Sequence, residues 1–202
     1  MDEIWTSLQV GGQHLPDYIK VPSPVHVTAE TISGTNSVQL LVDNGVADLL
    51  SGHIYMIGCG DKGQLAVDKE AIVKDVVILT TCDLDFGQGA VVENSLLMTK
   101  STSKSSVSSA SGFQLGRDDN CAADGGSQIL TYGGVHVAAG LEVYGSQIIA
   151  SQDINFSANA DGVQGVSFIA GGSIDGTSNA NICFCITGME RSFELPYFRL
   201  AG

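Results

Sequence analysis

An internal repeat of about twenty residues constrains the fold of this chain more than any other feature of its sequence. The stretch Gly145–Gly162, GSQIIASQDINFSANADG, contains two short apolar runs followed by a corner rich in turn residues. Related units begin at four further residues, Val76, Ser95, Ser127 and Ser167. Successive units are therefore 19, 32, 19 and 21 residues apart, and the long spacing is one period plus an insertion around Gly112–Gly126. A fixed period of this length is typical of solenoid proteins.

The residue types within the repeat favour strands over helices. Each unit carries β-branched and aromatic residues in runs of four or five, broken by Gly, Asn, Asp and Ser. Nowhere does an apolar stripe with helical spacing continue for three turns. We therefore predict an all-β fold, a parallel β-helix (β-solenoid) with ~20-residue coils and short capping segments. Right-handed coils are expected, because parallel crossovers are almost always right-handed.

In such a stack, equivalent residues of successive coils form files at the strand spacing of ~4.8 Å. One inward file is predicted to contain Ile78, Leu97, Ile129, Ile148 and Ile169. A second inward file contains Leu84, Val135, Ile154 and Ile174. The neighbouring file, which faces solvent, contains Asp85, Lys104, His136, Asn155 and Asp175. The serines Ser95, Ser127, Ser146 and Ser167 are expected to point inward and to form a ladder of hydroxyls bonded between coils.

The chain of 202 residues is long enough for one domain with a buried core. We predict an extended N-terminal segment over residues 1–36, which hold three of the four prolines, a β-helix domain over 37–187 and a C-terminal cap over 188–202. A short helix over Asp43–Leu50 is expected to cover the open end of the stack. The polar stretch Thr99–Ser111 is predicted to be a coil of the stack rather than a flexible linker, since it fits the period.

Charge and hydropathy exclude several classes of partner. The net charge is −13, with only nine Lys and Arg, so neither a nucleic acid nor an anionic membrane surface is an expected partner. No apolar run approaches the ~20 residues of a spanning helix. The first residues, MDEIWTSLQVGG, lack the basic and apolar regions of a signal peptide. We expect any membrane contact to be made through a segment that is absent from this chain.

The five cysteines indicate a disulfide-bonded protein. Cys183 and Cys185 are separated by one residue, which is not the spacing of a zinc site. Cys59 and Cys82 each follow a short apolar strand and are 23 residues apart, about one coil. Stacked coils would bring their Cα atoms within the disulfide range of about 4.4–6.8 Å. A second bridge would join Cys121, in the insertion, to Cys183 or Cys185, which leaves one odd thiol and predicts an oxidising compartment. The alternative is five free thiols in a cytosolic protein.

Paired carboxylates raise the alternative of polysaccharide chemistry. Asp83 and Asp85 share one face of a strand, and Asp153 and Asp175 lie further along the stack. Two carboxyl groups at a set separation can cleave a glycosidic bond. These aspartates occupy strand edges and corners, however, where Asp commonly caps turns, and the three arginines lie outside the stack. We expect no catalysis; the alternative is a carbohydrate-active enzyme or sugar-binding module that uses Asp83 and Asp85.

An oxygen-rich cluster in the insertion contains Asp118, Asp119, Asn120 and Asp124. Oxygen ligands of this kind can hold Ca²⁺, but the spacing does not match an EF-hand loop. The favoured interpretation is a solvated acidic loop and no cofactor. His136 is interpreted as a surface histidine, and no P-loop, nucleophile-elbow or dinucleotide-binding motif is present.

Five stretches carry a family resemblance: VVILTTCDLDFGQGAVVENSLLM, GRDDNC, GLEVYGSQIIASQDINFSA, GVSFIAGGSIDGTSN and GMERSFELPYFRLA. Together, across residues 53–202, they resemble the periplasmic or extracellular part of TadE/TadG-like Flp (tight-adherence) pilus-assembly proteins. The resemblance implies a membrane-anchored, pilin-like protein that serves pilus assembly and surface attachment. This chain departs from that pattern in lacking the N-terminal membrane helix. The resemblance also matches Cys185 rather than Cys183, which implies a Cys121–Cys185 bridge and leaves Cys183 as the odd thiol.

The residues and the resemblance together predict a non-enzymatic, exported structural or adhesive component of a bacterial Flp-type (Tad) pilus system. We expect it in the periplasm or at the cell surface, with other pilus-assembly or pilin subunits as partners; self-association is left open. An ice-binding role is disfavoured because the file that faces solvent is too mixed in residue type.

Overall fold

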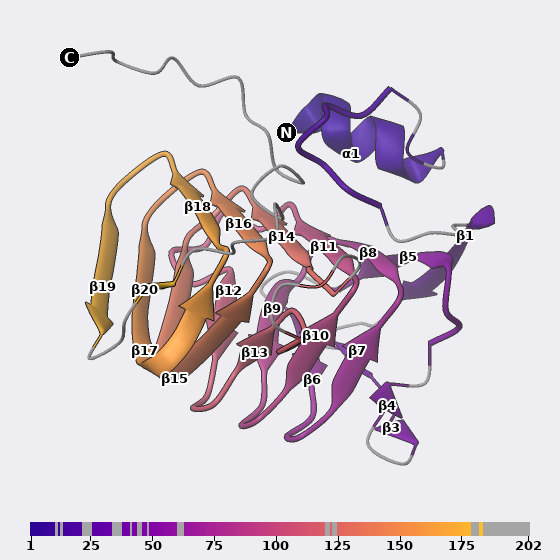
Figure 1. Ribbon diagram of the computed structural model, residues 1–202. Coiled ribbons are helices and arrows are strands. Elements are labelled where there is room, and N and C mark those ends of the chain that lie inside the picture. Colours follow the sequence, from indigo (N-terminus) through magenta and orange to yellow (C-terminus); the bar gives the residue numbers. More distant parts are fainter. Residues whose placement is uncertain are drawn as a thin grey trace.

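The computed structural model describes residues 1–10, 12, 14–21, 26–33, 38–40, 42–43, 46–47, 49–59, 63–119, 122, 125–178 and 182–183. Nearly all of the strands among these residues are parallel, and they form a β-solenoid of about six turns (Figure 1). One short helix, α1 (Asp2–Gln9), lies beside the stack. The predicted β-solenoid fold is therefore confirmed.

One side of the solenoid is a seven-stranded parallel sheet. In spatial order its strands are β1 (His26–Ser33), β5 (His53–Gly58), β8 (Val77–Thr80), β11 (Leu96–Thr99), β14 (Gln128–Thr131), β16 (Gln147–Ala150) and β18 (Ser167–Ala170). Each coil contributes one strand to this sheet, so neighbouring strands come from successive turns of the chain.

A thirteen-stranded sheet forms the other two sides. The second side contains β2 (Val38–Gln39), β6 (Gln64–Val67), β9 (Asp83–Phe86), β12 (Val107–Ser109) and β19 (Ile174–Ser178). The third contains β3 (Val42–Asp43), β4 (Val46–Ala47), β7 (Ile72–Lys74), β10 (Val91–Glu93), β13 (Gln114–Leu115) and β20 (Ile182–Cys183). The long strands β15 (Val135–Tyr144) and β17 (Ile154–Gln164) run through both sides and join them.

The first predicted inward file is correct in four members, Ile78, Leu97, Ile129 and Ile148, which pair in sequence and are almost fully buried. Its fifth member is wrong. Phe168 occupies that position, and Ile169 pairs instead with Ile149. The cause is the last coil, which is 20 residues long, from Gln147 to its partner Ser167, rather than 21. The same slip removes Ser167 from the predicted serine file.

The second predicted file is confirmed in register, because Leu84, Val135, Ile154 and Ile174 occupy one row with Val107 between the first two. Its first three members are buried, whereas Ile174, in the last described coil, is exposed. In the file that faces solvent, Ser108 and not Lys104 stands between Asp85 and His136. The correction follows from a longer corner, since residues 100–106 separate β11 from β12, whereas residues 81–82 separate β8 from β9. The polar stretch that contains β12 is thus a coil of the stack, as predicted.

A ladder of buried serines runs along the corner that precedes the seven-stranded sheet. The Oγ atom of Ser95 accepts the backbone N–H of Val76 at 3.1 Å, and that of Ser127 accepts the N–H of Ser95 at 3.1 Å. Ser146 continues the pattern with the N–H of Ser127 at 2.8 Å. The same hydroxyls donate to the carbonyls of Glu93, Val92 and Tyr144, respectively. The predicted hydroxyl ladder is confirmed for these three serines.

Helix α1 covers the outer face of the seven-stranded sheet rather than an end of the stack (Figure 1). Ile4, Trp5 and Leu8 on one side of the helix are buried. They belong to one cluster with outward-facing residues of the sheet, Ile54, Val77, Leu79, Leu96, Met98 and Leu130. The predicted extended conformation of residues 1–36 is therefore wrong over α1, because strands that are apolar on both faces need a cover.

The segment after α1 is held to the same face by a glutamine. Gln128 donates from Nε2 to the carbonyl of Tyr18 and accepts the N–H of Lys20 at Oε1, both at 2.7 Å. Its Nε2 also donates to Oε1 of Gln147 on the next strand at 2.7 Å. This glutamine pair lets backbone polar groups rest against an otherwise apolar surface.

The predicted helix over Asp43–Leu50 is wrong. Strands β3 and β4 pair antiparallel there, with Val42 opposite Ala47 and Asp43 opposite Val46. The Asn-Gly dipeptide at 44–45 is a strong sequence signal for a hairpin, which outweighs the weak helix-capping pattern. The expected cap over residues 188–202 lies outside the described residues, and the division of the chain at residues 36 and 187 stays a prediction.

The serine ladder makes Ser127→Ala a test of how the coils are held together. The substitution leaves the N–H of Ser95 and the carbonyl of Val92 without their hydroxyl partner in the interior. We expect the free energy of unfolding to fall by about 2–3 kcal/mol, measured by urea denaturation. The exposed Ser105→Ala serves as the control and should change it by less than about 0.5 kcal/mol. Equal effects of the two substitutions would contradict the ladder.

Acid should loosen α1. Tyr132 donates to Oδ1 of Asp2 at 2.6 Å, and this bond is the main reason that the pKa of Asp2 is lowered; Lys100, 3.7 Å away, adds to it. Because the folded-state pKa is lowered, the stabilisation is complete above the ordinary aspartate value and disappears as pH falls through the lowered one. Lys100 also lies 4.7 Å from the ring centroid of Trp5, the only tryptophan.

We therefore expect Trp5 fluorescence to shift towards that of exposed tryptophan in an acid titration, with a midpoint below 3.8, while circular dichroism still reports the strands. The Asp2→Asn variant should lack this step. An identical acid transition in the wild type and in Asp2→Asn would show that Asp2 does not hold the helix.

Candidate functional site

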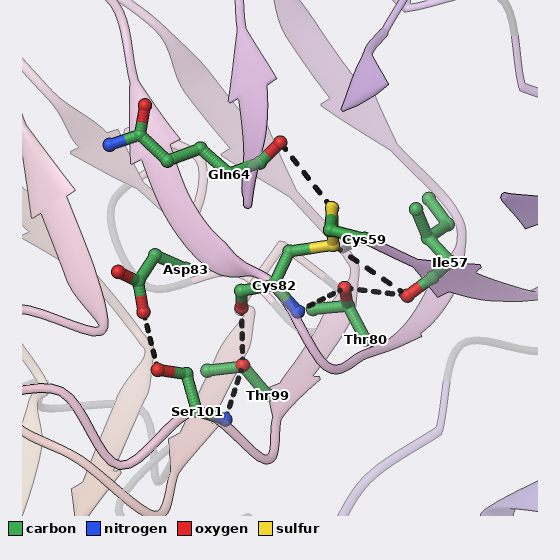
Figure 2. The surroundings of a disulfide bond; sticks show 8 residues. All are labelled: Ile57, Cys59, Gln64, Thr80, Cys82, Asp83, Thr99 and Ser101. Carbon is green, nitrogen blue, oxygen red and sulfur yellow. Dashed lines mark hydrogen bonds between the residues drawn. A yellow bond between two sulfur atoms is a disulfide. The ribbon is translucent and has the colours of Figure 1, made fainter. Parts of the chain in front are cut away.

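The predicted bridge between Cys59 and Cys82 is present and joins two successive coils (Figure 2). Cys59 follows β5 and Cys82 lies in the corner after β8, and their Cα atoms are 5.3 Å apart. The register explains the contact, because Ile57 pairs with Thr80 and each cysteine lies two residues further along its coil. Cys82 is buried, whereas Cys59 is half-buried.

A second hydroxyl ladder, which was not predicted from the sequence, lies next to this disulfide. Thr80 donates to the carbonyl of Ile57 at 2.7 Å and accepts the N–H of Cys82 at 3.0 Å (Figure 2). One coil later, Thr99 donates to the carbonyl of Cys82 and accepts the N–H of Ser101. Thr131, in the same row, accepts the N–H of Gly133 at 2.9 Å. The sequence does contain a signal for this ladder, because a threonine ends three successive apolar runs that form strands β8, β11 and β14.

Asp83 and Asp85 share the outward face of β9, as predicted. Oδ1 of Asp83 accepts a short hydrogen bond from the hydroxyl of Ser101, and Oδ1 of Asp85 accepts one from Ser108 at 2.9 Å. Both serines belong to the following coil. Each carboxylate therefore links two coils through a hydroxyl, which is a structural use of the group.

Asp153 and Asp175 lie in the last described coils. Oδ1 of Asp153 accepts the backbone N–H of Ser173 at 2.8 Å, and the Ser173 hydroxyl lies 3.2 Å from it. The same hydroxyl is 3.3 Å from Oδ2 of Asp175. Asp153 thus holds the corner of the next coil, the role that aspartates commonly have in turns.

The predicted calcium cluster is only partly described. Both carboxylate oxygens of Asp119 have partners, since Arg117 donates from Nε to Oδ2 and Ala122 donates its N–H to Oδ1, each at 2.9 Å. The bond to Asp119 is also the main cause of the raised pKa of Arg117. Asp118 is exposed, and the other predicted ligands, Asn120 and Asp124, lie outside the described residues. Within the described ranges, no group of three or more His, Cys, Asp or Glu side chains is placed to hold a metal ion.

The expected Cys121–Cys185 bridge also lies outside the described residues. Cys183 lies in β20, whose backbone pairs with β17. This second pairing therefore stays a prediction.

The outward file ends in a shallow groove over β15, β17 and β19. His136, Asn155 and Asp175 lie side by side on these strands, as the sequence predicted. A second row, Ala138, Ser157 and Thr177, lies two residues further along the same strands. The groove encloses about 330 Å³. It presents imidazole, carboxamide, carboxylate and hydroxyl groups to the outside.

These features define the protein as a disulfide-bonded parallel β-solenoid with a polar outer groove. The chain belongs to a family described as a domain of unknown function, DUF7867, which matches residues 1–186. No curated protein and no solved structure matches the chain. In the described part of the chain, no helix has the length and apolar character needed to cross a membrane.

Loss of the Cys59–Cys82 bridge should destabilise the first coils. The bridge closes a loop with a sequence separation of 23, and we expect Cys59→Ala/Cys82→Ala to lower the free energy of unfolding by about 3 kcal/mol. Thr81→Ala, at an exposed position in the same corner, keeps the bridge and is the matched control. Urea midpoints under non-reducing conditions compare the two variants. A double variant as stable as the control would contradict a stabilising role for the bridge.

Proposed function

We propose that the protein is a non-enzymatic, exported structural or adhesive component of a bacterial Flp-type (Tad) pilus system, acting in pilus assembly or surface attachment. The observation that carries the proposal is the way its polar groups are used. The buried serine hydroxyls, such as that of Ser146, and the carboxylates of Asp83 and Asp85 form hydrogen bonds between successive coils.

This use of carboxylates favours a scaffold over a glycosidase. A catalytic pair needs two carboxyl groups that face a substrate, one of them able to give up a proton to the leaving group. Here, Asp83 and Asp85 each accept a hydrogen bond from a serine of the next coil. One oxygen of each carboxylate, Oδ1, is thus used to join two coils of the stack.

The disulfide supports the exported part of the proposal. Bridges of this kind form and persist in oxidising compartments, such as the periplasm and the cell exterior. Cys59–Cys82 is consistent with such a location, and the proposed site of action is the periplasm or the cell surface.

The pilus part of the proposal draws on the resemblance of residues 53–202 to TadE/TadG-like proteins. Other pilus-assembly or pilin subunits are the partners that this role requires. A β-solenoid of about six turns, with continuous outer sheet faces, suits a role in which contacts are made with neighbouring subunits or with a surface.

Deletion in the native cell tests the proposal, with pili counted by microscopy and attachment scored on a solid surface. We expect attachment to fail in the deletion strain and to be restored by wild-type protein. A copy carrying Asp83→Ala/Asp85→Ala should restore it as well, because the proposed role needs no catalytic carboxylate. Two results together would favour the carbohydrate-active enzyme instead. The deletion strain would have normal pili and attachment, and the purified protein would cleave a polysaccharide that the Asp83→Ala/Asp85→Ala variant does not cleave.

A further inference from the structure

The groove over β15, β17 and β19 differs from the rest of the outward file in how its polar groups are presented. Asp85 and Ser108, earlier in the file, are hydrogen-bonded to each other. His136 and Asp175, in the groove, are exposed, and Asn155 between them is half-buried; Asp175 has a long contact of 3.3 Å from the Ser173 hydroxyl to its Oδ2. Polar groups of this stretch are therefore offered to an outside ligand.

The chemistry of the groove is mixed rather than of one charge. An imidazole, a carboxamide and a carboxylate stand in one row, with the hydroxyls of Ser157 and Thr177 in the next. Such a set offers both donors and acceptors. Ligands with many hydroxyl groups, each a donor and an acceptor, match it best.

The charge of the groove narrows the class of ligand further. None of the residues that line the groove is Lys or Arg, and Asp175 is a carboxylate. The chain as a whole carries a net charge of −13. An acidic polymer would be repelled, whereas a neutral one would not.

The shape of the groove suits an extended polymer. Its polar row repeats once per strand, at ~4.8 Å along the solenoid axis. Ala138, Ser157 and Thr177 are small, so a flat chain can approach the sheet closely beside the longer side chains. The groove also reaches β19, which is the last strand of its side among the described residues.

We propose that this groove binds a neutral polysaccharide, laid across β15, β17 and β19 with its hydroxyls bonded to His136, Asn155 and Asp175. The inference rests on the proposed adhesive role and names the class of surface that the protein recognises. It is separate from the Asp83 and Asp85 pair and includes no cleavage step.

Binding of purified protein to immobilised oligosaccharides tests the inference directly. The probes are linear neutral hexasaccharides of glucose, galactose and mannose, with hexagalacturonate as the acidic comparison. We expect binding to at least one neutral probe and none to hexagalacturonate. Asn155→Ala/Asp175→Ala should weaken binding at least tenfold, while Lys74→Ala, exposed on the third side of the solenoid, should not change it. Circular dichroism checks that each variant is folded.

Absence of binding to every neutral probe, or equal binding by wild type and Asn155→Ala/Asp175→Ala, would overturn the inference. In cells, the groove variant should restore pili to the deletion strain but not attachment to a surface coated with the bound polysaccharide. Full attachment of the groove variant would contradict polysaccharide binding by the groove but would leave the proposed function standing. Normal attachment of the deletion strain would contradict the proposed function, whatever the purified protein binds.

Discussion

The structure depends on satisfying backbone polar groups at corners, where the chain leaves one strand and has not yet entered the next. Parallel strands pair well along their length, but a buried corner has N–H and carbonyl groups without a ladder partner. Two rows of buried hydroxyls supply those partners, serines before the seven-stranded sheet and threonines after it. The hydroxyls of Ser95, Ser127, Ser146, Thr80 and Thr99 each accept one N–H and donate to one carbonyl, so small side chains connect coils without taking space from the apolar files. Thr131 accepts the N–H of Gly133 and is hydrogen-bonded to the hydroxyl of Ser106.

The outer faces of the solenoid differ in the polarity of their side chains. The second side of the solenoid turns short polar side chains outward and meets solvent directly. The seven-stranded sheet is apolar on both faces, so it needs α1 and the Tyr18–Lys20 segment as a cover. The cover is held by a small number of polar contacts at its edges, those of Asp2 and Gln128. The Cys59–Cys82 bridge joins two coils at the corner where the chain leaves β5 and β8 of this sheet.

The sequence was sufficient to predict the solenoid because the period and the two-residue alternation are independent signals that agree. It could not fix the last coil, since Phe168 and Ile169 are both apolar and either can point inward. Alignment on Ser167 chose the wrong one, and only the pairing of Ser167 with Gln147 decides it. Helix α1 was missed for a different reason. It is eight residues long and too short to be stable alone, so its formation depends on a sheet face that no local pattern reveals. At the groove, His136, Asn155 and Asp175 were placed in one file correctly, but their shared exposure is a property of the folded coils.

The parallel stack brings particular residues of different coils into contact. Nuclear Overhauser effects between the methyl groups of Leu97 and Ile129, and between Ile148 and the ring of Phe168, measure this directly in isotope-labelled protein. The parallel stack predicts both contacts, although the first joins residues 32 positions apart. It also predicts that Ile169 contacts Ile149 on the opposite face of the sheet. Contacts that pair these strands in antiparallel order, or that place Ile169 against Ile148, would contradict the register on which the ladders, the disulfide and the groove all depend.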